Sequence, residues 1–200
     1  MTNILPYVGQ VLLIAILATI LVNRFVFVFK LRNAVIGIVI VLGMFLPVAG
    51  LTLGQWIRSV VGDFSVFTLV VFANILAQRL FHFSLLHPTS RNSLLLGIVL
   101  LGLIFYPLAL GLSSFDPYHL GYAPGLMSVL LCLGSLVAWI KTRYDLAIVL
   151  LLPLIAFNLH LLESYNLWDY LLDPILLLYI LVQIFVATKE YFLERRRMRK

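Results

Sequence analysis

The sequence predicts an all-α integral membrane protein, a bundle of seven transmembrane helices with an extracytoplasmic N-terminus and a cytoplasmic C-terminus. The first reason is composition: the 200 residues are 63% hydrophobic and 11% charged, with a mean hydropathy of +1.11, whereas soluble domains are about one quarter charged. The second is the presence of seven apolar segments near the length that a helix needs to cross a bilayer. The third is the placement of the basic residues.

The seven segments follow one another with short connections, so we interpret residues 1–200 as a single transmembrane domain. In chain order, the predicted spans cover about 4–22, 34–53, 64–86, 93–112, 122–140, 146–162 and 174–191. The third span is short as a strictly apolar run, and we expect Arg79 to extend its charged end toward the headgroups. Residues 192–200 are predicted to form a basic cytoplasmic tail.

The positions of lysine and arginine orient the predicted bundle. With the N-terminus outside, every one of the 14 Lys and Arg residues except Arg58 falls in a segment assigned to the cytoplasm. Cytoplasmic loops of membrane proteins carry this excess. Six or eight spans would break the alternation. The sequence therefore predicts a multi-pass membrane protein with this orientation, and its compact design with short loops favours the plasma membrane of a bacterium.

The same distribution indicates the partners. The net charge of +6 comes largely from the basic C-terminal residues and short loops, which is not the pattern of a nucleic-acid-binding surface. We expect contacts with anionic headgroups at the cytoplasmic face and a protein partner in the membrane, and no nucleic acid. No cofactor is predicted.

Several residues mark expected helix starts. Asn92-Ser93 and Asp145 are typical N-caps for the fourth and sixth spans, and Gly62-Asp63 resembles a start for the third. Asp173, followed by a proline, is predicted to cap the seventh. We also expect a short interfacial helix near 164–172 in the last outer loop, with its aromatic residues at headgroup depth. Those aromatic residues are Tyr165, Trp168 and Tyr170.

Candidate functional residues all lie on the predicted outer side. The catalytic candidates are His160, Glu163, Asp169 and Asp63, and the binding candidates are Arg58, Asp116, His119, Asn158 and Trp168. His160 and Glu163 are three residues apart, so on a continuous helix they would share a face and a proton. A metal site would need a further ligand from another loop, and we predict no metal site. Asp116, before a proline, is typical of a turn.

Three function classes remain open from the sequence. The chain lacks P-loop, CxxC and HExxH motifs, which favours a non-catalytic subunit or accessory factor of an envelope-facing complex, interacting through its acidic and aromatic outer loops. One alternative is an enzyme that acts on a lipid or lipid-linked substrate at the outer leaflet. The other is a small transporter or flippase with a cavity formed by kinks at Pro47, Pro107 and Pro153.

Overall fold

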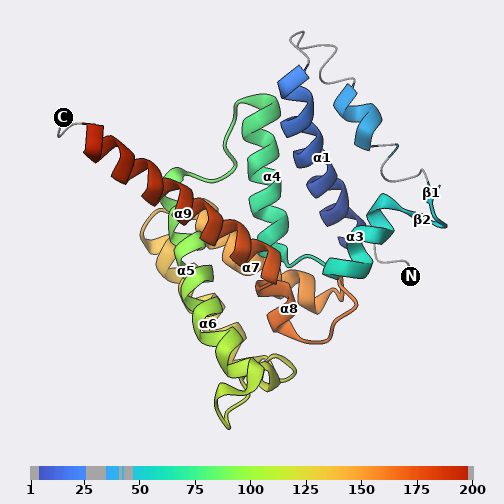
Figure 1. The fold of residues 1–200 in the computed structure, drawn as a ribbon. Coiled ribbons are helices and arrows are strands. Elements are labelled where there is room, and N and C mark those ends of the chain that lie inside the picture. Colours follow the sequence, from blue (N-terminus) through green and yellow to red (C-terminus); the bar gives the residue numbers. More distant parts are fainter. Residues whose placement is uncertain (1–4, 26–34, 41, 43–46, 198–200) are drawn as a thin grey trace.

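The protein is largely helical within the residues that the structure describes. The structure is a computed structural model, and it describes residues 5–25, 35–40, 42 and 47–197. Its element order confirms the predicted all-α class (Figure 1). The elements are α1 (Leu5–Phe25), β1 (Pro47–Val48), β2 (Leu51–Thr52), α3 (Leu53–Val61), α4 (Val66–Phe81), α5 (Pro88–Pro107), the π-helical turn η1 (Leu108–Leu112), the 3₁₀ turn η2 (Pro117–Gly121), α6 (Gly125–Ile140), α7 (Tyr144–Asn158), α8 (Leu167–Leu171) and α9 (Pro174–Arg197).

Each predicted span except the second coincides with one of these helices. Among the described residues, two helical stretches are long and apolar enough to cross a membrane by length and composition, namely Pro88–Leu112 and Pro174–Arg195. The apolar stretches of α1, α4, α6 and α7 are shorter. Large apolar side chains are nevertheless exposed along α5, α6 and α9, and such surfaces mark contacts with a membrane or a protein partner.

The end of the second predicted span is a hairpin rather than a helix. The span was predicted over 34–53, and residues 35–40 are helical, while 41 and 43–46 lie outside the described part of the chain. From Pro47 the chain forms β1 and β2, which pair as antiparallel strands. The reason is local: proline has no N–H to donate to a helix, and Gly50 turns the chain with a φ of 85°.

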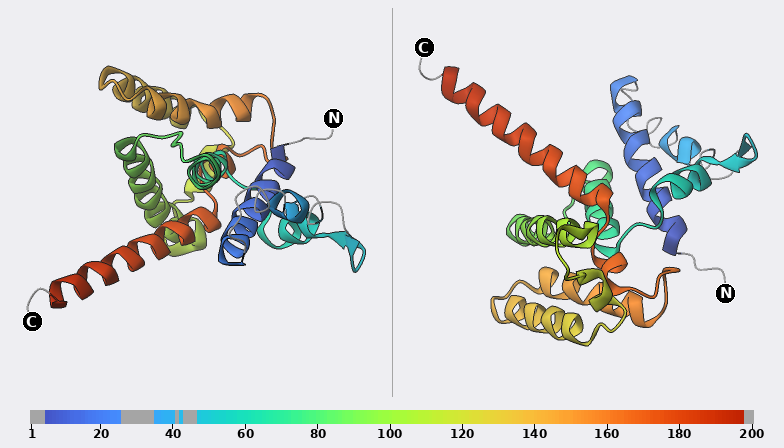
Figure 2. Two further views of the ribbon diagram at one scale, coloured as in Figure 1. Left: turned by 90° about the horizontal axis from the view of Figure 1, so that it is seen from above. Right: turned by 60° about the horizontal axis from the view of Figure 1, so that its bottom comes forward.

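The core is concentrated around the short helix α8. α1 packs along α4 and α6 packs along α7, and Figure 1 shows the first of these pairs side by side. One cluster joins α4, α5, α7 and α9 around α8, in which Leu167 and Tyr170 are fully buried. The C-terminal half of α9 extends beyond the other helices (Figure 2). Buried apolar contacts therefore hold the helices together at the end of the bundle where α8 lies.

Asp173 caps α9 and also bonds to the start of α4. Its Oδ1 accepts a hydrogen bond from the Leu176 N–H at 2.8 Å, which confirms the predicted cap of α9 with Pro174 in its first turn. Its Oδ2 accepts the Ser65 N–H at 3.0 Å and the Thr68 hydroxyl at the start of α4. The side chain is buried, with 6% of the residue exposed. The carboxylate thus replaces water for three donors at the junction of α4 and α9.

α5 begins earlier than predicted. We expected Asn92-Ser93 to start this helix, but both residues lie inside it, because α5 begins at Pro88 and His87 is its N-cap. Proline is favoured in the first helical turn, where its missing N–H has no helical partner to lose. The prediction was wrong because the first turn of α5 is polar and falls outside the apolar run.

The aspartates predicted to cap the third and sixth spans bond elsewhere. Ser65, rather than Asp63, caps α4. Asp145 lies within the first turn of α7, and its carboxylate accepts the His87 N–H and the Ser90 hydroxyl, each at 2.8 Å. Asp145 therefore joins the start of α7 to the start of α5, which are neighbours in space but more than 50 residues apart in sequence.

Candidate functional site

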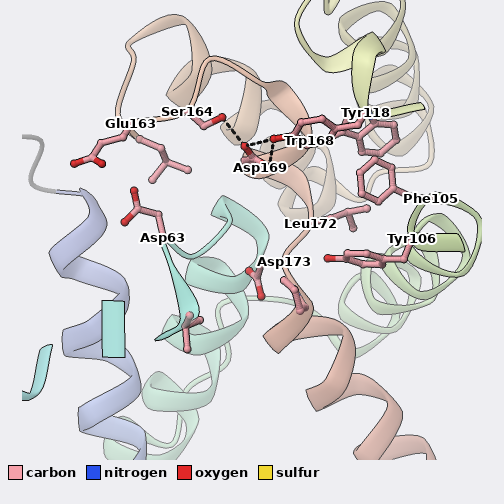
Figure 3. A pocket seen from close by; sticks show the side chains of 13 residues that line it. Asp63, Phe105, Tyr106, Tyr118, Glu163, Ser164, Trp168, Asp169, Leu172 and Asp173 are labelled. Atoms are coloured by element: carbon pink, nitrogen blue, oxygen red, sulfur yellow. Dashed lines mark hydrogen bonds between the residues drawn. The ribbon is translucent and has the colours of Figure 1, made fainter. Parts of the chain in front are cut away.

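A pocket of about 440 Å³ lies at the α8 end of the bundle, and it gathers half of the 8 acidic residues of the chain. We call it the carboxylate pocket. Its lining residues are Val61, Asp63, Phe105, Tyr106, Tyr118, Leu162, Glu163, Ser164, Trp168, Asp169, Leu172, Asp173 and Pro174. Figure 3 shows the four carboxylates, Asp63, Glu163, Asp169 and Asp173, around it. The volume is in the range of small-molecule sites, roughly 300–1,000 Å³.

Arg58 joins the loop before α4 to the loop before α8. Its Nε donates to Asp63 Oδ1 at 2.8 Å and its Nη2 to Asp63 Oδ2 at 3.4 Å. The same Nη2 lies 2.6 Å from Glu163 Oε1. Hydrogen bonds to Asp63 and then to Glu163 raise the pKa of Arg58 above its usual range. Arg58 therefore neutralises part of the negative charge at the rim of the pocket.

The local sequence explains why Arg58 reaches Asp63. Thr52 and Gln55 form a capping box that fixes the start of α3. Gly62 ends this helix with a φ of 79°, and its N–H bonds back to the Arg58 carbonyl. Because glycine accepts that conformation without strain, the chain reverses and brings Asp63 against the Arg58 side chain.

We expect the two ion pairs of Arg58 to contribute unequally to stability. The Asp63 side chain is 17% exposed and meets Arg58 through both oxygens, whereas the Glu163 side chain is 70% exposed and meets it through one. Exposed pairs contribute about 0.2–1 kcal/mol because water screens them. Double-mutant cycles with Arg58→Ala, Asp63→Ala and Glu163→Ala, read by chemical unfolding in mild detergent, should give the larger coupling for Asp63 despite the shorter Glu163 distance. Equal couplings would contradict this assignment.

Asp169 is held by two hydroxyl donors. Tyr118 Oη donates to its carboxylate at 3.0 Å, and Ser164 Oγ donates to Oδ2. Tyr118 belongs to η2, where Asp116 accepts the Tyr118 N–H at 2.9 Å and initiates the turn as predicted. Burial, and then the negative charge of Asp169, raise the pKa of the Tyr118 phenol well above its usual range. Asp169 is thus fixed between α8, η2 and the loop before α8.

The raised pKa of Tyr118 predicts a loss of stability in alkali. The folded-state pKa lies above the unfolded value of about 10, so the contribution is fully present below pH 10 and is lost as the pH rises through the folded-state pKa. Replacing Tyr118 with phenylalanine should lower the unfolding temperature at pH 7 and flatten its decline above pH 10. Tyr165→Phe is the control, because it removes a phenol from a position that is 72% exposed. Equal profiles for wild type and Tyr118→Phe would refute the effect.

Trp168 and Tyr170 are buried in the fold, contrary to their predicted place among the headgroups. The Trp168 Nε1–H donates to the Pro117 carbonyl at 2.9 Å, and its ring centre lies 4.4 Å from that of Phe105. The Tyr170 hydroxyl accepts the Leu162 N–H at 3.2 Å. Both rings find polar partners for their single polar atom inside the junction, as buried tyrosine and tryptophan usually do. Of the three predicted aromatic residues, Tyr165 is exposed.

His160 and Glu163 do not share a helical face. We expected both on one helix, but α7 ends at Asn158, and His160 has a left-handed φ of 49° that redirects the chain. His160 is exposed and packs near the Tyr165 ring, with centres 5.8 Å apart. The amide of Asn158 donates to the carbonyl one turn back, Leu154 O, at 2.7 Å. These geometries do not form the acid–base pair that the spacing indicated.

The structure therefore divides the candidate residues into two groups. Asp63, Glu163, Asp169 and Trp168 line the carboxylate pocket. Arg58 is bonded to two of them. Asp116, His119, Asn158 and His160 do not line it, and all four are exposed. Within the described residues, no three His, Cys, Asp or Glu side chains are placed to hold a metal ion.

Sequence reasoning missed four lining residues that shape the pocket: Phe105, Tyr106, Tyr118 and Ser164. Phe105 and Tyr106 lie within an apolar run and look like ordinary span residues. Tyr118 had a weak signal, because it follows the Asp116-Pro117 turn in a loop assigned to the same side as the acidic residues. Ser164 is the first residue of the predicted interfacial helix, and no pattern marks it as a lining residue.

The chain matches no protein-family model, no curated protein and no solved structure. Its class is therefore defined by the fold and the pocket alone: an all-α protein that has an acidic, aromatic pocket and, within the described part of the chain, two helices long and apolar enough to cross a membrane. Chemically, the pocket suits a ligand that carries positive charge or several hydroxyl donors, because its oxygens accept and its rings offer flat apolar contact.

Proposed function

We propose that this chain is a seven-span protein of a bacterial plasma membrane and serves as a non-catalytic subunit of an envelope-facing complex. In this proposal the carboxylate pocket and the adjoining loops face outward and hold a partner. The cytoplasmic side carries the basic loops, the tail at 192–200 and contacts with anionic headgroups. The support is the alternation of apolar segments with basic loops, together with helices that coincide with all but one of those segments.

The binding role is supported by the ion pairs and hydrogen bonds that the four carboxylates of the pocket make within the fold. Asp63 and Glu163 are paired with Arg58, while Asp169 and Asp173 accept hydrogen bonds from neighbouring donors. A general acid or base must exchange its proton with a substrate, whereas these groups are committed to partners within the fold. Such a preassembled acidic surface, flanked by the exposed Tyr165 ring, favours recognition over proton transfer.

The subunit role can be tested by site-specific crosslinking in native membranes. A photoreactive amino acid at Tyr165, beside the pocket, should give one discrete larger adduct that persists through purification in mild detergent. Charge reversal by Glu163→Lys should abolish that adduct. The same probe at Leu130, an exposed position on α6, is the matched control and should give no such product. A lone monomer without adducts at Tyr165 would overturn the proposal.

The proposed orientation has its own test. In a Cys132→Ser background, single cysteines at Ser114 and Thr142 should differ in their reaction with a membrane-impermeant maleimide. Intact cells should label position 114 and not position 142, and opened cells should label both. Labelling of position 142 in intact cells would reverse the orientation and contradict the outward-facing pocket.

A second candidate is an enzyme acting on a lipid-linked substrate at the outer leaflet. The volume and acidity of the pocket favour it, and Asp169 is the best-placed group because it borders the cavity beside Tyr118 and Ser164. Asp169→Asn preserves size and removes the charge. If that variant abolished function while the protein stayed folded and the crosslinked complex stayed intact, the enzyme would replace the subunit as the preferred function.

A further inference from the structure

A second cavity, of about 450 Å³, lies between α4, α5 and α9. It is bordered by the C-terminal half of α4, the N-terminal half of α5 and the middle of α9, so it lies toward the opposite ends of these helices from the carboxylate pocket. We call it the Arg91 groove. Its wall combines apolar side chains such as Val71, Leu95 and Ile180 with the polar residues Arg91 and Gln183.

Arg91 is incompletely bonded. Within the described residues, its Nε is buried without a hydrogen-bond partner, and its Nη2 donates to the side chain of the next residue, Asn92 Oδ1, at 3.5 Å. Among the described residues, no carboxylate forms an ion pair with Arg91, and none lines the groove. A buried donor without a partner is costly. A guanidinium in this state is complementary to an anion that offers several oxygens, and phosphate is the best geometric match.

The rest of the groove is complementary to a hydrocarbon chain. Leu95, Val99 and Ile180 provide apolar wall on two helices. Two of its lining residues, Leu96 on α5 and Ile184 on α9, are 59% and 50% exposed, so the groove opens to the surroundings of these helices. A ligand with an anionic head and an apolar tail would therefore place its charge at Arg91 and its tail along α9, with part of the tail in the surrounding bilayer.

The position along the helices agrees with this ligand. In the proposed topology, Arg91 belongs to the cytoplasmic side, together with Arg79 and Arg143. Anionic phospholipids give the cytoplasmic leaflet its negative surface potential, and basic pockets between helices on that side accept their headgroups. Depth and charge therefore point to the same leaflet.

We propose that the Arg91 groove binds one anionic phospholipid of the cytoplasmic leaflet, with its phosphate on Arg91 and Asn92 and one acyl chain between α5 and α9. The inference rests on the proposed membrane placement and not on the proposed partner at the carboxylate pocket. It concerns a different site and a different leaflet.

Native mass spectrometry of the full chain in mild detergent tests the site. The protein is titrated separately with phosphatidylglycerol, with phosphatidylcholine and with inorganic phosphate. Wild type should retain one phosphatidylglycerol at concentrations where phosphatidylcholine is about tenfold less occupied, and it should retain no inorganic phosphate. Arg91→Gln should reduce phosphatidylglycerol occupancy about tenfold. Arg91→Lys should reduce it less, because lysine keeps the positive charge and loses only the paired donors of the planar guanidinium.

Arg79→Gln is the matched control, because it removes the same charge from an exposed position on α4 that does not line the groove. It should leave occupancy unchanged. Leu96→Trp, at a lining position that is 59% exposed, should obstruct the acyl chain while keeping every charge. Unfolding temperatures without lipid check that each variant is folded.

Three results would overturn the proposal. They are equal retention of the two lipids, equal losses in Arg79→Gln and Arg91→Gln, and retention of inorganic phosphate alone. Failure of the partner proposal would be seen separately, as the absence of a Tyr165 adduct with lipid retention intact. Failure of the membrane placement would be seen as release of the protein from membranes by alkaline carbonate.

Discussion

Replacing Asp173 with alanine is expected to destabilise the protein by roughly 3–5 kcal/mol. The change removes the acceptor for the Ser65 N–H, the Thr68 hydroxyl and the Leu176 N–H together. Each buried donor that loses its partner costs about 1–3 kcal/mol, and loss of a helix cap alone costs about 1 kcal/mol. Chemical unfolding in mild detergent measures the change, and the yield of monodisperse protein should fall with it.

Two further variants make this expectation specific. Asp173→Asn keeps the size and one acceptor oxygen, so its loss should be intermediate. Asp116→Ala removes a cap from the exposed turn η2 and should cost no more than about 1 kcal/mol. If Asp173→Ala and Asp116→Ala were equally mild, water would be replacing the Asp173 carboxylate, and its role in joining α4 and α9 would be wrong.

Gly121→Ala is expected to disrupt the junction between η2 and α8. A Cβ at Gly121 would overlap Asn166 Oδ1 and come within 2.8 Å of Trp168 Cδ1. Asn166 is fully buried, and it accepts the Trp168 N–H and donates to the Tyr118 carbonyl, each at 2.9 Å. Overpacking costs about 1–3 kcal/mol, and displacing Asn166 adds the lost hydrogen bonds, so we expect a total of about 3 kcal/mol or more.

The chain offers a matched control for this substitution. Gly97 lies inside α5, where a Cβ would meet no atom within 4 Å, so Gly97→Ala should stabilise the helix by about 0.5–1 kcal/mol. A double-mutant cycle with Asn166→Ala gives a second check, since removing the Asn166 side chain removes the worst overlap. The two losses should then be less than additive. Additive losses would place the strain outside the Gly121–Asn166 contact.

The elements that could be predicted from the sequence depend on strong local signals. Long apolar runs predicted α1, α4, α5, α6, α7 and α9, with boundary errors of up to six residues. Asp173-Pro174 was predicted correctly because an N-cap followed by proline has one dominant meaning. A short helix was predicted near 164–172, because two aspartates four residues apart disfavour one continuous helix. The structure places α8 at 167–171.

The failed predictions depend on contacts between distant segments. Helical spacing put His160 and Glu163 on one face, but the sequence gives no sign that α7 ends at Asn158. Trp168 was placed at the headgroups because tryptophan is common there, whereas its N–H finds the Pro117 carbonyl 51 residues away. Only the folded chain can show that pairing.

The sequence predicted where the acidic residues of the candidate site lie, but not which side chains they bond. The sequence grouped the outer acidic residues by topology, and the structure brings Asp63, Glu163 and Asp169 to one pocket. Their partners could not be predicted, because Arg58 has no sequence pattern that pairs it with Glu163, which lies far along the chain. The Arg91 groove was missed for the same reason, since α9, which forms its third wall, lies far along the chain from α4 and α5.

The bond from Ser65 to Asp173 also sets an order of events during synthesis. The two residues are 108 positions apart. At about 5–20 residues per second, a ribosome needs roughly 5–20 s to make the intervening chain. Throughout that interval the first turn of α4 has no carboxylate acceptor. The first turn of α4 must therefore wait for the start of the last helix to gain this acceptor, and a truncation before Asp173 would leave α4 with the Ser65 cap alone.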